Sequence, residues 1–199
     1  MAYHAAMTQP GASGAKTDRF FTVLPKVLLA SLVVNLPMLA LLLVPQLMRS
    51  RAGSEALLLI GSTLYCALVG IALTFAARVS GWAAPRATVW TTRSAGRTAR
   101  GIRRTQAQEF WQRVGEWLLL FLLAQAAGFL IAWLLPYVWD NPEFGTPGEP
   151  RWIISYGNYA VQAVTIYLFS CLSFAWFGVR LRQLALAAVT WNEPAPPFS

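Results

Sequence analysis

The segment RATVWTTRSAGRTARGIRRTQAQEFWQR, from Arg86 to Arg113, decides the architecture of the chain because long apolar runs without charge lie on both sides of it. It carries seven of the sixteen basic residues in a protein of 199 residues. The whole chain is 56% hydrophobic and only 12% charged, whereas an ordinary soluble domain is about 25% charged. Composition therefore predicts an integral membrane protein that holds this basic segment outside the bilayer.

Four apolar runs without charge are long enough to cross a membrane as helices, because a spanning helix needs about 20 residues. They lie at residues 27–48, 56–77, 117–139 and 152–179. The turn between the first two runs is too short to recross a bilayer, so these helices must be antiparallel. We therefore predict an all-α membrane protein with four transmembrane helices in two antiparallel hairpins, joined by a basic, partly helical cytoplasmic segment.

This interpretation divides the chain into consecutive regions. We expect hairpins at residues 26–78 and 116–182, with the basic linker between them at 79–115. A flexible tail is expected at 1–25, because this part is small, polar and rich in Gly, Ala and Ser. The C-terminal part, 183–199, is expected to form a short interfacial segment and a tail.

The distribution of charge predicts the orientation. With four spans, the basic linker and both termini lie on one side of the membrane, and the loop 140–151, with three acids and one base, lies on the other. The positive-inside rule then places both termini and the linker in the cytoplasm. Arg49 and Arg51, in the first turn, do not fit the positive-inside rule, because they lie on the side opposite the cytoplasm. Because fourteen of the sixteen basic residues are Arg and Ala is abundant, we expect a bacterial inner membrane protein.

Polar and small residues inside the first and third spans mark expected helix contacts. Pro37 removes a backbone donor and predicts a kink, while Asn35 is expected to hydrogen-bond a neighbouring helix rather than a substrate. In the third span, Gln125 is the one strongly polar interior residue. Small residues at every fourth position predict a flat stripe for helix packing. They are Ala124, Gly128 and Ala132.

The fourth span carries a polar stripe. Its members fall within about 120° on a helical wheel: Ser155, Asn158, Tyr159, Gln162, Thr165 and Ser173. Because polar side chains in lipid seek protein or water, the stripe is expected to face the bundle interior, a partner subunit or an aqueous cavity. The opposite side of the helix comprises Leu168, Cys171, Leu172 and Ala175.

Five arginines of the basic segment fall within about 60° of one another if the segment is helical. They are Arg86, Arg93, Arg97, Arg100 and Arg104. A helix is expected over 94–113, continuing into the third span. The first interpretation of this arginine face is a topology-setting surface that contacts anionic lipid headgroups. An alternative is the docking of an acidic protein partner, and a nucleic-acid partner is the third and weakest interpretation.

The sequence favours no catalytic chemistry. His4 is the only histidine, Cys66 and Cys171 are isolated within apolar runs, and Glu116 stands at the start of a span as a partner for Arg113. Two-histidine haem, histidine zinc and iron–sulfur sites all need more ligands than this. We therefore expect no metal, no cofactor and no enzymatic activity.

Two hypotheses about function remain after these exclusions. The leading one is a non-catalytic subunit or assembly factor of a larger bacterial inner-membrane complex, with other membrane subunits as partners. The alternative is a small homo-oligomeric transporter or channel whose pathway is lined by Asn35, Gln125 and the fourth-span stripe. No small-molecule substrate is assigned. An enzymatic hypothesis ranks third and would need a lipid or quinone bound against Trp133 and Trp176.

Overall fold

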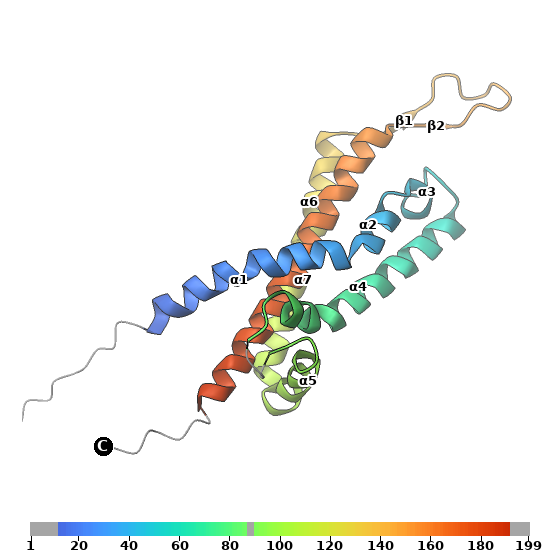
Figure 1. Ribbon diagram of the computed structural model, residues 1–199. Coiled ribbons are helices and arrows are strands. Elements are labelled where there is room, and N and C mark those ends of the chain that lie inside the picture. Colours follow the sequence, from blue (N-terminus) through green and yellow to red (C-terminus); the bar gives the residue numbers. More distant parts are fainter. Residues whose placement is uncertain (1–11, 87–89, 192–199) are drawn as a thin grey trace, which may run out of the picture.

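The computed structural model describes the backbone of residues 12–86 and 90–191, and the side chains of 20–86 and 90–188. The described chain is mostly helical (Figure 1). Within it, three helices are long and apolar enough to cross a membrane: α4 (Glu55–Ala83), α6 (Ala107–Leu134) and α7 (Tyr156–Trp191). A bent pair of helices before them makes a fourth span if it is counted as one. This agrees with an all-α membrane protein.

The bent pair begins with α1 (Ala12–Val34) and continues, after Asn35, as α2 (Leu36–Leu42) at an angle of 57°. Pro37 occupies the first turn of α2, where its missing N–H costs least, so the expected kink is present as a break. The chain then forms the one-turn helix α3 (Pro45–Met48) rather than the single helix expected through residue 48.

The start of α1 corrects the expected tail at 1–25. Residues 12–25 are helical, and residues 1–11 lie outside the described part. From Phe20 onward the helix packs on α7, because Phe20 and Val27 are buried in a cluster with Ala175 and Val179. The rings of Phe20 and Trp176 meet edge to face with centroids 4.8 Å apart. Tertiary packing thus overrides the weak local signal.

The basic linker is anchored by an aromatic residue. Trp90 is fully buried, and its indole Nε1 donates to Ser80 Oγ at 3.0 Å. The backbones of Arg86 and Trp90 exchange hydrogen bonds of 2.8 and 3.2 Å. The following helix, α5 (Ala95–Thr105), ends at Gln106, whose φ of −129° is not helical. The expected continuous helix over 94–113 is therefore wrong, because α6 starts anew at Ala107.

A short antiparallel ribbon joins α6 to α7. Strand β1 (Val138–Asp140) pairs with β2 (Trp152–Ile154), in a register that sets Val138 opposite Ile154 and Asp140 opposite Trp152. The helical runs expected through 139 and from 152 are therefore shorter. Pro136 follows the end of α6, and the β-branched and aromatic residues of the two strands fit a ribbon better than a helix.

Helix α7 forms the centre of the molecule and contacts α1, α2, α4, α5 and α6. It continues to Trp191, through the part expected to form a short interfacial segment, and residues 192–199 lie outside the described part. Figure 1 shows α5 near the C-terminal end of α7, while the β1–β2 ribbon lies at the opposite end. The orientation of these ends relative to a membrane stays a prediction.

Candidate functional site

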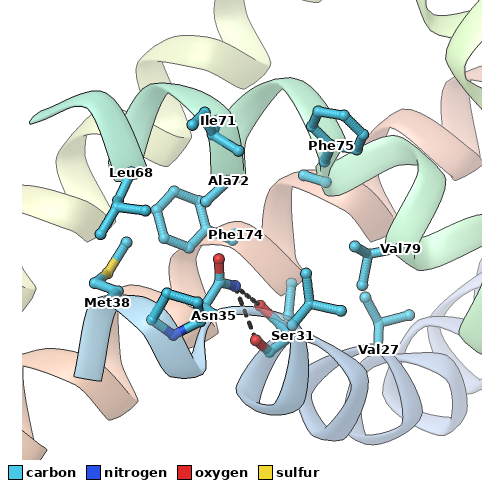
Figure 2. A pocket seen from close by; sticks show the side chains of 14 residues that line it. Val27, Ser31, Asn35, Met38, Leu68, Ile71, Ala72, Phe75, Val79 and Phe174 are labelled. Carbon is cyan, nitrogen blue, oxygen red and sulfur yellow. Dashed lines mark hydrogen bonds between the residues drawn. The ribbon is translucent and has the colours of Figure 1, made fainter. Parts of the chain in front are cut away.

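A cavity of about 220 Å³ lies at the break between α1 and α2, where α4 and α7 close its other sides. Figure 2 shows α4 facing the broken helix across it, with Ile71, Ala72 and Phe75 on one side and Asn35 on the other. Ser31 and Asn35 are the only polar side chains among its fourteen lining residues. The cavity is therefore an apolar chamber with polarity at a single point.

The polar point is held by hydrogen bonds. Asn35 Nδ2 donates to Ser31 O at 2.8 Å and to Ser31 Oγ at 3.1 Å, and Ser31 Oγ donates to Cys171 O at 3.3 Å. Asn35 is only 9% exposed. Among the described residues, none donates a hydrogen bond to Asn35 Oδ1. Figure 2 shows this oxygen turned away from Ser31 and toward α4. The expected interhelical role of Asn35 is carried through Ser31, which bonds α7.

Two tyrosines of α7 bind the broken helix on either side of its break. Tyr167 OH donates to Leu32 O near the end of α1, and Tyr159 OH donates to Leu42 O at the end of α2, at 2.6 Å. In lipid, carbonyl groups at a helix end need such donors because water is absent. The bend is therefore held by α7 rather than left free to straighten.

The small residues of the third span lie in α6, which packs closely against α7. Ala124 and Gly128 are buried, and Ala132 is half-buried. A Cβ added at Gly128 would overlap Cγ1 of Ile166 on α7, so the two helices approach closely there. Gln125 turns to another helix and donates through Nε2 to Tyr65 OH at 3.1 Å on α4.

The polar stripe of α7 divides into a buried and a peripheral part. Tyr159, Gln162 and Ser173 are buried. Asn158 Nδ2 donates to Pro136 O at 2.7 Å, and Thr165 Oγ1 returns to its own helix at Val161 O. Ser155 Oγ accepts a long bond of 3.5 Å from Asn158 N.

The side of α7 opposite the polar stripe is only partly exposed. Leu168 is 46% exposed, but Cys171 and Ala175 are fully buried and Leu172 is half-buried. These positions are covered because α7 is enclosed by α1, α4 and α6 together. A helical wheel cannot distinguish an apolar side that faces lipid from one that packs on another helix.

Only three of the five arginines of the predicted face lie on a helix. Arg97, Arg100 and Arg104 lie on α5 and are exposed, while Ala95 and Ile102 on its other side are buried. Arg93 and Arg86 are also exposed but precede the helix, so five arginines on one helical face is an overestimate. Arg100 Nε bonds its own helix at Gly96 O. Within the described side chains, none of the five forms an ion pair.

Near α5, the ion pairs of the described residues are formed by Glu116 of α6. Its carboxylate pairs with Arg113, as expected, and with Arg180 Nε of α7 at 3.1 Å. Arg180 also lies 5.6 Å from the ring of Trp176, which donates to Glu116 at 3.4 Å. This cluster ties the start of α6 to α7, and its connection to Arg180 was missed because 64 positions separate the partners.

The two arginines that do not fit the positive-inside rule, Arg49 and Arg51, lie over aromatic rings at the end of the molecule that carries the β1–β2 ribbon. Arg49 stands 5.7 Å from the ring of Tyr137 and 5.9 Å from that of Tyr159. Arg51 and Arg151 lie 4.6 and 5.3 Å from the ring of Trp152. Cation–π contacts within about 6 Å are favourable, so these charges have a packing role that topology rules do not anticipate.

Among the described side chains, no group of three or more His, Cys, Asp and Glu residues could hold a metal. No protein-family model matches the chain, and no curated protein or solved structure matches it significantly. The site must therefore be interpreted from its own geometry. It offers a neutral chamber inside the helices and a cationic surface outside them.

Proposed function

We propose that this protein is a non-catalytic subunit or assembly factor of a larger bacterial inner-membrane complex, and that its arginine face docks an acidic cytoplasmic partner. The observation that carries the proposal is the rigid mounting of that face. Arg97, Arg100 and Arg104 project outward from a helix whose opposite side is buried through Ala95 and Ile102.

A segment that only set topology would not need this mounting. Positive charge in a solvated loop satisfies the positive-inside rule whatever its conformation. Here Trp90 is buried and bonded to Ser80, and α5 contacts α4, α6 and α7. A helix that is already held in place loses less conformational entropy when its arginines pair with carboxylates than a mobile loop would. The arrangement therefore favours recognition over simple retention of charge.

The outer faces of α4 and α6 supply surface for membrane partners. Large apolar side chains are exposed along both helices, among them Leu59 at 70%, Phe129 at 74% and Trp133 at 72%. These faces are suited to lipid or to the helices of another subunit. Combined with the arginine face, they give the protein contact surfaces both within the bilayer and beside it.

The transporter hypothesis is less well supported by the same contacts. A pathway needs polar side chains that are free to bind a solute. Among the described residues of the expected lining, the acceptors Gln162 Oε1 and Asn35 Oδ1 receive no hydrogen bond. However, Gln125 is bonded to Tyr65, Tyr159 to Leu42 O and Asn158 to Pro136 O, so most of the expected lining is already used within the chain. For this reason we put forward the subunit role alone.

The test is purification from native membranes in a mild detergent. We expect acidic partner proteins to co-purify with the wild type and to be lost when Arg97, Arg100 and Arg104 are all changed to Glu. The matched control changes the same three residues to Lys, which keeps the charge; it should retain most of the partner.

Two results would overturn the proposal. One is a wild-type protein that purifies as a monomer without partners. The other is a Glu variant that keeps every protein partner and loses only anionic phospholipid, because this would show that the arginine face contacts lipid headgroups alone.

A further inference from the structure

We propose that the cavity at the α1–α2 break binds one neutral, membrane-soluble molecule bearing a hydroxyl group, and that this hydroxyl donates a hydrogen bond to Asn35 Oδ1. This inference concerns the interior of the helices and does not depend on the docking proposed for the arginine face. It rests on the unused acceptor, the neutral lining, and the size and opening of the cavity.

The remaining hydrogen-bonding capacity of the cavity specifies a donor. Both polar side chains use their donors within the chain, since Asn35 Nδ2 bonds Ser31 and the Ser31 hydroxyl bonds Cys171 O. Asn35 Oδ1 accepts nothing from the described residues and faces the cavity, although Asn35 as a whole residue is only 9% exposed. Within a membrane, a carbonyl oxygen without a donor is unfavourable. An alcohol or phenol would supply the donor, whereas a ketone, quinone or ether would not.

The lining also excludes charged ligands. The other lining side chains are aliphatic or aromatic, or belong to proline, and include Met38, Leu68, Phe75 and Phe174. An ion placed among them would lose its hydration without a counter-charge. A pure hydrocarbon would fit the walls but leave Asn35 Oδ1 without a donor. A neutral molecule with an apolar body and one hydroxyl satisfies both conditions.

The size and opening of the cavity limit the shape of this molecule. Apolar cavities of about 150 Å³ hold benzene, so about 220 Å³ accommodates a substituted ring or a comparable length of chain. Lining residues on the outer side are exposed, with Val34 at 46%, Ile71 at 54% and Phe75 at 44%. The cavity therefore opens sideways between the broken helix and α4. The ligand can reach it from lipid and leave its tail there.

The experiment uses a photoreactive probe in the full-length protein in detergent. An alkylphenol carrying a diazirine is crosslinked by light, and labelled peptides are identified by mass spectrometry. We expect labelling at α1 and α4 residues that line the cavity. Two competitors of similar shape are compared, 4-propylphenol and its methyl ether 4-propylanisole. The phenol should compete about fivefold better, because the ether has no donor and one neutral hydrogen bond corresponds to about this factor.

Two variants separate the cavity from the hydroxyl contact. Ala72→Leu fills the cavity from α4 and should abolish the specific labelling. Asn35→Leu removes the acceptor and should make the phenol and its ether equally good competitors. Gly70→Ala is the matched control, because an added Cβ there meets nothing within 4 Å; it should label like the wild type. Circular dichroism and elution volume verify that each variant is folded.

Equal competition by the phenol and the ether in the wild type would overturn the proposal. So would labelling that spreads over the lipid-facing helices and is unchanged by Ala72→Leu, since this would indicate adventitious partitioning of the probe. Neither result depends on the co-purification of protein partners, so failure here is distinguishable from failure of the docking role.

Discussion

Helix α7 and the two outer spans, α4 and α6, are all apolar enough to cross a membrane but differ sharply in burial. In the most apolar 18-residue window of each, 56% of α7 is buried inside the protein, against 11% of α4 and 17% of α6. The hydrogen bonds that hold the first span also come from α7, through Tyr159, Tyr167 and Cys171. One helix thus organises the others, and the outer spans leave most of their own surface exposed.

The comparison shows how a bundle is held together without water. Association of helices in lipid depends on close packing and on hydrogen bonds between helices, since burial of apolar area gains little there. Helix α7 supplies both, through its approach to Gly128 of α6 and its tyrosine bonds to the carbonyl groups of α1 and α2. Variants that damage α7 contacts should therefore be costlier than equivalent changes on outer faces.

The largest effect is expected for Gly128→Leu. Even a Cβ at this position would overlap Ile166, so a leucine must push α6 away from α7. Overpacking of this kind costs about 1–3 kcal/mol, and we expect the upper end because two helices must separate. The free energy of unfolding in mixed micelles titrated with dodecyl sulfate measures it.

The matched control for this variant is Gly115→Leu on the same helix, where an added Cβ meets nothing within 4 Å. It should not lose stability. The second change Ile166→Ala should restore part of what Gly128→Leu loses, because it frees space at the same point. Equal losses at positions 115 and 128 would contradict the close approach of α6 and α7.

An intermediate effect is expected when the tyrosine bonds to the broken helix are removed. Tyr159→Phe and Tyr167→Phe each leave a carbonyl group, Leu42 O or Leu32 O, without its donor. Each loss should cost about 1 kcal/mol, and the two together about 2 kcal/mol. Tyr156→Phe is the control, because Tyr156 is 58% exposed. A double variant as stable as this control would show that α7 does not hold the bend.

The membrane class and the break in the first span were predictable because each rests on local chemistry. Long runs without charge identify spanning helices, and Pro37 beside Asn35 identifies the break. The inward position of Tyr159 and Gln162 followed from polarity. By contrast, burial of Cys171 depends on the number of helices that surround α7, and this is a property of the whole fold.

The candidate site was less predictable than the fold. Asn35 was identified as a polar residue with an interhelical role, but the cavity beside it arises only when α4 approaches from 33 or more positions away. The anchoring of the arginine face was missed for a similar reason, because Trp90 and its partner Ser80 both lie in the segment interpreted as a basic linker. Long-range contacts of single residues leave no periodic pattern in the sequence.

The smallest effect is expected at the contact between the two outer spans themselves. Gln125 of α6 donates to Tyr65 of α4 at 3.1 Å, and both residues are only half-buried. Polar contacts between membrane helices average about 0.6 kcal/mol in double-mutant cycles. We therefore expect this coupling energy from Gln125→Leu, Tyr65→Phe and their combination, measured by the same unfolding titration. A coupling larger than the loss from Tyr159→Phe would mean that α4 and α6 hold each other directly, and α7 would no longer be the organising helix.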